Sequence, residues 1–267
     1  MSLIRALRLS GLALLTSVLL AGIAPPARAD YPVAPDVVVF CEPTLQHVVA
    51  DIGGLWRART GIKVRVFTSP TPALLEQIAH HARDDVIIGE GDAEADAAAD
   101  QHLIKKETVQ RVWGNHLVIA SLAGGSDGAD GGSPSADKLA AVAGKNSIAV
   151  VDPWAAKAGA DSQRALQSLG LWQAVSARST GAVGTADAAY LLAQGKVKLA
   201  IIYATDVAAN PAFTVAEPLP AAGYPPVVYW VAQTEHALSP NASKFVTFLR
   251  SADAQQRARA DGLEILP

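Results

Sequence analysis

Residues 37–67 read VVVFCEPTLQHVVADIGGLWRARTGIKVRVF, and this stretch decides the fold class. Its β-branched start, Val37–Phe40, is typical of a buried strand. The apolar residues that follow recur at helical spacing and form one face of a helix: Leu45, Val48, Val49, Ile52, Leu55 and Trp56. Gly61 fits the C-terminal cap of that helix, and Lys63–Phe67 follows as a second strand. This order predicts a β-α-β unit with parallel strands.

The same alternation continues along the chain. Further short apolar runs predict strands at Asp85–Ile88, Leu117–Ala120, Ile148–Val151, Leu199–Tyr203 and Val227–Val231. Helical patterns lie between them: Thr185 opens a helix that Gly195 ends, and Ser239-Pro240 precedes Lys244–Leu249. Short buried strands that alternate with helices indicate an α/β fold with largely parallel sheets.

At four points a strand-like run ends in a turn that opens a helix: Pro43-Thr44, Pro70-Thr71-Pro72, Lys157-Ala158-Gly159 and Gly184-Thr185. The first amides of a helix have no acceptor inside it and carry partial positive charge, so each start is a candidate anion site. A threonine before a helix is also a common N-cap, and Thr71 followed by Pro72 fits that role. Four such starts in one chain favour a protein that captures a small oxyanion and does not transform it.

Residues 1–29 have the features of a leader for export. Arg5 and Arg8 precede the apolar run Leu12–Ile23, and Ala27-Arg28-Ala29 has the form of a cleavage site, so we place the cut after Ala29. Cleavage removes three of the 22 basic residues and leaves 19 against 25 acidic ones, so the net charge of −3 becomes −6. We therefore expect an exported, periplasmic protein, and neither nucleic acid nor an anionic membrane as its partner.

Two chemical alternatives have weaker support. Gly124-Gly125-Ser126-Asp127-Gly128 fits the G-x-S-x-G pattern of serine hydrolases, but more glycines and a proline follow where that motif needs a helix. A flexible loop over residues 124–134 is the favoured interpretation. Cys41, the single cysteine, excludes an internal disulfide. A metal site made of Cys41, Glu42 and His47 lacks recognised ligand spacing, and we expect no metal, no cofactor and no enzymatic activity.

Several stretches carry a family resemblance: Val39–Leu45, Ala73–Ile78, Asp152–Gly159, Leu166–Trp172, Ile201–Asp206 and Pro225–Tyr229. Tyr203-Ala204-Thr205-Asp206, directly after an apolar strand, is the most specific of them. From about Val37 to the C-terminus the chain resembles the periplasmic molybdate-binding proteins of ABC transporters.

The resemblance implies a two-lobed periplasmic binding protein fold, similar to type II. Two mixed sheets flanked by helices would be joined by two crossing strands that act as a hinge. We expect residues 30–120 and 226–267 to form the first lobe and residues 121–225 the second. The partners implied are a small oxyanion, such as molybdate or tungstate, and an ABC transporter permease in the membrane. We expect the protein itself to be a monomer.

The resemblance also implies a ligand site in an uncharged pocket. The hydroxyl positions of the family match Thr44 and Thr71, the main-chain donors match Ala158 and Thr185, and the phenol matches Tyr203. Ser69 is the reserve candidate, because the alignment near Thr71 can shift by one residue.

Glu42 departs from the family pattern, which has small residues there. A carboxylate inside a desolvated anion pocket repels a dianion by several kcal/mol. We therefore expect Glu42 to point to solvent if the ligand resembles molybdate. Otherwise the protein binds another ligand, such as an organic acid, a phosphate-like group or a metal, partly through Glu42 or Cys41.

Overall fold

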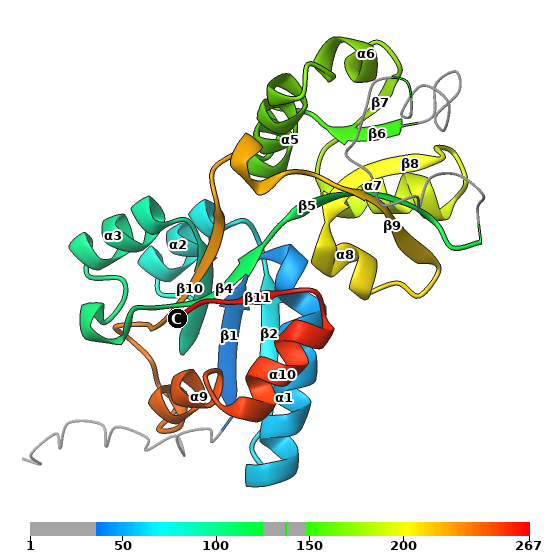
Figure 1. Ribbon diagram of the computed structural model, residues 1–267. Helices are drawn as coiled ribbons and strands as arrows, with labels where there is room; N and C mark the ends of the chain where they lie inside the picture. Colours follow the sequence, from blue (N-terminus) through cyan, green and yellow to red (C-terminus); the bar gives the residue numbers. More distant parts are fainter. Residues whose placement is uncertain (1–35, 125–136, 138–147) are drawn as a thin grey trace, which may run out of the picture. The chain divides into compact units, whose positions relative to one another are not determined.

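The computed structural model describes residues 36–124, 137 and 148–267 and contains two mixed β-sheets with helices on both faces of each (Figure 1). The predicted α/β fold class is thereby confirmed. Residues 1–29 and 125–134, which carry the predicted leader and most of the glycine-rich loop with Ser126, lie outside the described residues. Within the part of the chain that is described, no helix is long and apolar enough to cross a membrane.

The first sheet has the strand order β11-β4-β10-β3-β1-β2. Its strands are β1 (Val37–Cys41), β2 (Val64–Thr68), β3 (Val86–Glu90), β4 (Gln110–Asn115), β10 (Val227–Gln233) and β11 (Glu264–Ile265). β1 pairs in parallel with β2 and β3, whereas β10 runs antiparallel to β3 and β4. The helices of this sheet are α1 (Gln46–Thr60), α2 (Thr71–Ala79), α3 (Asp92–Asp100), α9 (Ala242–Phe248) and α10 (Ala252–Ala260).

The second sheet has the order β7-β6-β8-β5-β9. Its strands are β5 (Leu117–Leu122), β6 (Ile148–Val151), β7 (Ser179–Ala182), β8 (Leu199–Tyr203) and β9 (Phe213–Pro218). β6 is parallel to β7 and β8, and β5 is antiparallel to β8 and β9. The helices here are α5 (Lys157–Ser168), α6 (Trp172–Ser176), α7 (Thr185–Ala193) and α8 (Ala204–Ala208). Three short 3₁₀ turns complete the described elements: η1 (Pro43–Leu45), η2 (Lys106–Thr108) and η3 (Ala221–Gly223).

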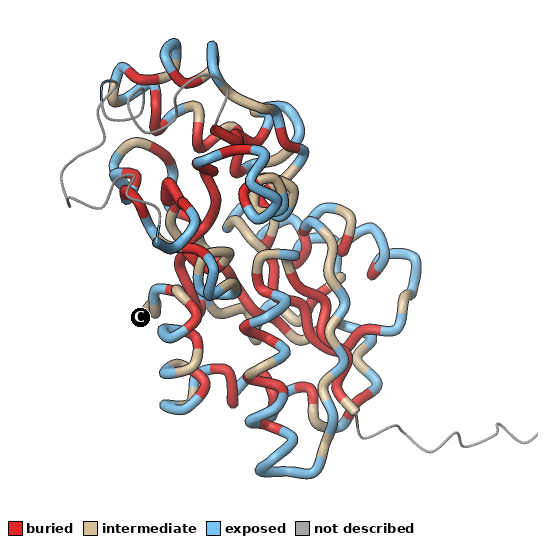
Figure 2. Tube along the Cα trace, turned by 90° about the vertical axis from the view of Figure 1, so that its right-hand side faces the viewer, coloured by how far each residue is buried: buried red, intermediate tan, exposed pale blue. Residues whose placement is uncertain are grey.

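Strand β1 shows why the core forms on both faces of the first sheet. Successive side chains of a strand point to opposite faces. Val37, Val39 and Cys41 accordingly join the buried cluster that includes α1, while Val38 and Phe40 join the one that includes α2 and α3. β1 is buried along its whole length and its neighbour β3 along nearly all of its own, and Figure 2 shows such buried segments in the interior. A strand buried on both faces needs an unbroken apolar run, which is what the sequence supplies.

The ends of the helices agree with the sequence in part. Gly61 ends α1 in the left-handed conformation (φ 75°), and its N–H donates to the Arg57 carbonyl at 2.8 Å, as predicted. Thr71, however, is the first residue of α2 and does not cap it; Pro70 occupies the N-cap position. The N-cap of α9 is Asn241, whereas Ser239-Pro240 in the sequence predicts a cap at Ser239, as Thr71-Pro72 does for α2.

The chain passes between the sheets twice. β4 ends at Asn115 in the first sheet and β5 begins at Leu117 in the second; β9 and β10 carry the chain back. The Leu117 N–H donates to the Tyr224 hydroxyl at 2.8 Å, which ties one crossing segment to the other. By their contacts all described residues belong to one compact unit, and the lobe boundaries expected from the sequence stay a prediction.

Gly159, in the first turn of α5, allows that helix to start directly against the end of β6. A Cβ atom at this position would lie 2.3 Å from the Asp152 carbonyl oxygen, and both are fixed by backbone geometry. We expect Gly159→Ala to lower the free energy of unfolding by about 1–3 kcal/mol through overpacking. Urea denaturation measures the change.

Gly54 provides the matched control, because it is exposed on α1 and an added Cβ meets nothing within 4 Å. Gly54→Ala is expected to raise stability by roughly 0.5–1 kcal/mol. Equal stability of Gly159→Ala and the wild type would show that the backbone at this helix start can relax.

Candidate functional site

A cavity of about 650 Å³ lies at the carboxyl ends of the central strands, and it brings the five sequence-predicted residues together. Thr44 and Thr71 line it from the first sheet, and Ala158, Thr185 and Tyr203 line it from the second. In open α/β folds this edge of a sheet is where ligands bind, because strand ends and helix starts meet there. The reserve candidate Ser69 is not among the lining residues; its N–H donates to the Cys41 carbonyl.

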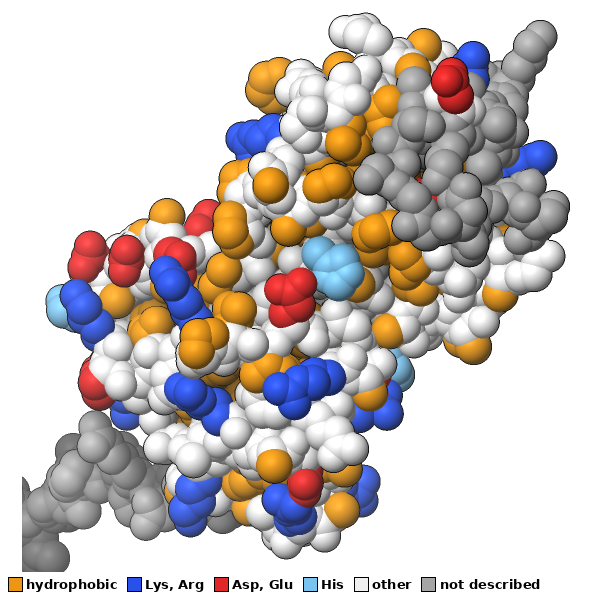
Figure 3. Space-filling model, viewed as in Figure 1, with side chains coloured by type: hydrophobic (Ala, Val, Ile, Leu, Met, Phe, Trp, Pro, Cys, Tyr) orange, Lys and Arg blue, Asp and Glu red, His pale blue; other side chains and the backbone are white. Residues whose placement is uncertain are grey.

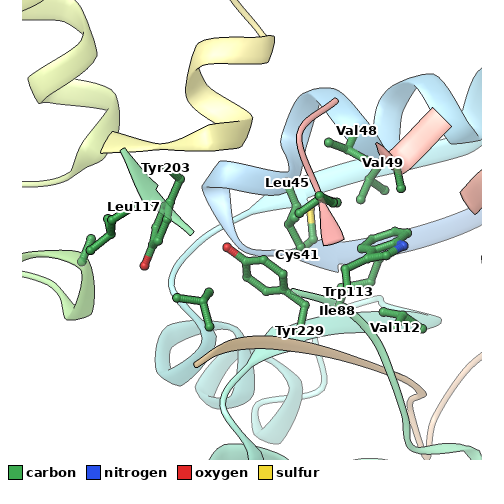
Figure 4. Close-up of a cluster of buried hydrophobic side chains, with 14 of the residues drawn as sticks. Cys41, Leu45, Val48, Val49, Ile88, Val112, Trp113, Leu117, Tyr203 and Tyr229 are labelled. Atoms are coloured by element: carbon green, nitrogen blue, oxygen red, sulfur yellow. The ribbon is translucent and has the colours of Figure 1, made fainter. Parts of the chain in front are cut away.

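Thr44 takes part in a buried polar network. It lies in η1, and its hydroxyl is 3.1 Å from the Tyr229 hydroxyl. Asn115 Nδ2 donates to the same phenol at 3.3 Å and to the Thr205 hydroxyl at 3.0 Å. Figure 4 shows Tyr229 beside Cys41 and Ile88 in the core, with Tyr203 apart from it. The Thr44 hydroxyl therefore has a protein partner in this structure.

Thr71 has both of its predicted donors in use. Its N–H donates to Glu42 Oε1 at 2.5 Å, and its hydroxyl donates to the same oxygen. The hydroxyl in turn accepts from the Glu90 N–H at 2.8 Å. The Glu42 carboxylate therefore occupies the N-terminus of α2, one of the helix starts that the sequence predicts as candidate anion sites. Of the two alternatives that the sequence left open for Glu42, the structure contradicts the one in which its side chain points to solvent, because Glu42 lines the cavity.

Burial is the main influence on the Glu42 carboxyl and raises its pKa from 4.5 to about 7. The hydrogen bonds from Thr71 lower the pKa, while the nearby charges of Glu90 and Glu94 raise it. No cation among the described residues forms an ion pair with Glu42. It is consequently a carboxyl group that can hold a proton near neutral pH.

Lys157, in the Lys157-Ala158-Gly159 turn, is a second charged group of the site, and its role was not predicted from the sequence. Its Nζ is 3.0 Å from Glu90 Oε1 and 2.7 Å from Asp161 Oδ2. Burial raises the pKa of Glu90, and Lys157 partly offsets the increase. The cavity is thus not the uncharged pocket expected from the resemblance: Glu42, Glu90 and Lys157 all line it.

The second sheet contributes unused donors. Ala158 and Thr185 lie in the first turns of α5 and α7, where amides have no acceptor inside the helix. Tyr203 ends β8, and its hydroxyl is buried without a hydrogen-bond partner among the described residues. Burial is the largest of the influences that raise the Tyr203 pKa well above 10, so the phenol remains a donor. A buried hydroxyl without a partner costs about 1–3 kcal/mol, which an acceptor in the cavity would recover.

Asp206 supports this side of the cavity. It accepts from the Tyr203 N–H at 3.0 Å, and burial raises its pKa to about 6, partly offset by that bond and by Thr185. These contacts fix the end of β8 against the start of α7.

Cys41, Glu42 and His47, the trio that the sequence offers only as a disfavoured metal site, are not brought together as a ligand set. The Cys41 thiol is buried in the core, and burial raises its pKa far above the usual value. His47 is exposed and faces Asp51 at 3.7 Å. Together with Asp261 these two form a group of potential ligands, but Arg257 already pairs with both aspartates.

The fold and the cavity between strand ends of two sheets define a class, the two-lobed solute-binding proteins. The family described as bacterial extracellular solute-binding protein matches residues 37–264, and the chain belongs to that family. It is therefore a solute-binding protein, as the sequence predicted.

Individual relatives agree with this assignment. The molybdate-binding protein ModA of Escherichia coli is 26% identical over 229 residues, which cover 86% of this chain and 89% of that protein. The periplasmic molybdate-binding protein of Azotobacter vinelandii superimposes with a TM-score of 0.73 at 20% identity, over 87% of this chain and 100% of that one. PEB3 with bound L-phospholactate, a protein from Campylobacter jejuni, gives 0.64 at 18% identity, over 86% and 99%. The similar structures confirm the two-lobed fold.

The raised pKa of Glu42 predicts a pH-dependent stability. Between about 4.5 and 7 the folded protein binds a proton at Glu42 that the unfolded chain releases, so the free energy of unfolding falls as the pH rises through this window. Gln at position 42 keeps an acceptor for Thr71 but does not titrate. We expect the stability of Glu42→Gln relative to wild type to rise by about 1–3 kcal/mol from the low to the high end of the window.

Urea titrations at several pH values provide the measurement. Other buried acids, such as Asp206, titrate in both proteins, so only the difference between the two curves reports on Glu42. Parallel curves would mean that Glu42 titrates near its ordinary pKa.

Proposed function

We propose that the protein is the periplasmic receptor of an ABC importer and captures a small oxyanion in the cavity described above. The observation that carries the proposal is the buried Tyr203 hydroxyl, which has no partner among the described residues. It lines the same cavity as the amide-bearing starts of α5 and α7. The names of the molybdate-binding relatives support an anion as the ligand.

The chemistry of the donors fits an anion. A phenol that stays protonated and first-turn amides at Ala158 and Thr185 all present hydrogen-bond donors and partial positive charge. An oxyanion accepts from several of them at once, and charge-assisted hydrogen bonds are stronger than neutral ones. Ligand capture thus satisfies donors that lack a partner in the described part of the chain.

Donors on both sheets allow one bound ligand to contact both lobes, which is the basis of the proposed transport role. With residues 30–120 and 226–267 as one lobe and residues 121–225 as the other, a ligand that contacts both lobes favours their closed arrangement. The Lys157–Glu90 ion pair joins the same two sides. The closed form would dock as a monomer on a permease in the membrane, without catalysis.

Glu42 favours a second candidate, a ligand other than a fully deprotonated dianion. Its carboxylate already occupies the Thr71 donors and would repel such a ligand. A cavity of about 650 Å³ also accommodates a small organic molecule. The L-phospholactate bound by PEB3 is an organic phosphate with a carboxylate, which gives this candidate a precedent within the same fold.

A ligand panel tests the proposed function on the purified protein. It includes molybdate, tungstate, sulfate, phosphate, a hydroxycarboxylic acid and divalent metals. A specific ligand at about 100 times its dissociation constant should raise the free energy of unfolding by about 2.7 kcal/mol. Thermal shifts identify the ligand and calorimetry measures its affinity.

Tyr203→Phe tests the carrying observation. Removal of a hydroxyl that donates to a charged ligand should weaken binding by roughly 1–3 kcal/mol. Because that hydroxyl has no partner within residues 36–124, 137 and 148–267, the stability of the unliganded protein should not fall. Tyr190→Phe is the control, since Tyr190 is exposed on α7 and does not line the cavity. Equal affinities for the wild type and Tyr203→Phe would remove Tyr203 from the site.

A further inference from the structure

Only one of the two carboxylate oxygens of Glu42 forms hydrogen bonds within the described part of the chain. Oε1 accepts both the N–H and the hydroxyl of Thr71, whereas Oε2 has no hydrogen-bond partner among the described residues. Glu42 belongs to the residues that line the cavity. The Glu42 carboxylate, a hydrogen-bond acceptor, therefore lines the same cavity as the donors of Tyr203, α5 and α7, which suit an anion.

We propose that Glu42 makes the cavity selective for an anion that carries its own hydroxyl group, such as an oxyanion that retains one proton. The Glu42 carboxylate accepts a hydrogen bond from that hydroxyl, while Tyr203 and the first-turn amides of α5 and α7 donate to the anionic oxygens. This assignment rests on the proposed function and names the ligand class for the same site.

The groups around Glu42 strengthen its preference for a donor. Glu90 and Glu94 add negative charge to its surroundings. Lys157, the cation that lines the same cavity, is held by Glu90 and Asp161. Where Glu42 is ionised, as it mainly is at about pH 8, a ligand without a proton would place oxygen against oxygen at this point. A ligand with a hydroxyl would form a charge-assisted hydrogen bond there, and sites built in this way reject analogues that lack the hydrogen-bonding group.

A purely structural role for Glu42 is the competing explanation, because its carboxylate also satisfies the start of α2. The substitution Glu42→Gln distinguishes the structural role of Glu42 from its role in ligand selectivity. The amide oxygen of Gln can still accept from Thr71, so the start of α2 keeps its partner. The amide nitrogen replaces the free carboxylate oxygen by a donor, which reverses the preference.

Phosphate and sulfate are the matched probes. At about pH 8 phosphate is mainly a dianion with one hydroxyl, and sulfate is a dianion of similar shape with none. Methyl phosphate, a dianion at this pH whose oxygens carry no proton, and glycolate, an organic hydroxy acid, complete the set. Phosphate tests the inorganic source of the hydroxyl and glycolate the organic one.

Calorimetry on the purified wild type and Glu42→Gln gives the decisive ratio. We expect the wild type to bind phosphate or glycolate at least about tenfold more tightly than sulfate and methyl phosphate. In Glu42→Gln this ratio should fall at least about tenfold, with a gain for sulfate. Glu42→Asp, which retains a carboxylate, should keep the preference for the hydroxyl-bearing ligand.

The outcomes separate this inference from the proposed function. An unchanged ratio in Glu42→Gln, or tighter binding of sulfate or molybdate by the wild type, overturns the role of Glu42 in selectivity. If Tyr203→Phe still weakens binding in that case, the proposed function stands. If no member of the panel binds the wild type, both are wrong.

Discussion

The hydrogen-bonded chain from Thr44 through Tyr229 and Asn115 to Thr205 is the interaction on which the cavity depends. It starts in η1, passes through β10 and the end of β4, and ends in α8, which lies between β8 and β9 of the second sheet. All four side chains are at least partly buried, where an unmatched polar group is expensive. The chain therefore fixes the segment that crosses between the sheets and, with it, the two sets of helix starts that face the cavity.

The physical character of the site follows from what those helix starts leave unmatched. At α2 the amide and hydroxyl of Thr71 already donate hydrogen bonds to Glu42. Tyr203 and the first turns of α5 and α7, in contrast, keep donors without a partner among the described residues. The side of the cavity near α2 thus carries a carboxylate, and its donors already have hydrogen-bond partners. The side near α5 and α7 offers unpaired hydrogen-bond donors within the described residues. Figure 3 shows that charges elsewhere are mixed: on that face of the described residues, Lys and Arg side chains lie among Asp and Glu side chains. The groups inside the cavity therefore select the charge of the ligand, and the surface charges of the protein do not.

Much of the fold could be predicted from the sequence, because buried strands are written as apolar runs. The seven predicted strands are present, and Gly61 ends α1 as expected. The strands that were missed, such as β7 (Ser179–Ala182) and β9, are short or partly exposed and lack a continuous apolar pattern. Their place in the sheet comes from pairing with distant strands, which local sequence does not encode.

The position of the site could be predicted from the sequence, but the contacts inside it could not. Helix starts after strands collect at one edge of a sheet, so the convergence of Thr71, Ala158 and Thr185 follows from fold rules. The contact between Glu42 and Thr71 spans 29 positions of the chain and depends on how η1 lies against α2, so composition and periodicity could not reveal it. The ligand roles of the five residues remain a prediction.

The burial of Cys41 has a consequence for chemical durability. Its thiol is sealed in the core with its pKa raised by desolvation, and oxidants attack the thiolate form. Because this is the only sulfhydryl of the chain, a folded copy offers no reactive sulfur for cross-linking to a second copy or to a foreign protein. The molecule can thus stay covalently single in an oxidising compartment without any disulfide of its own.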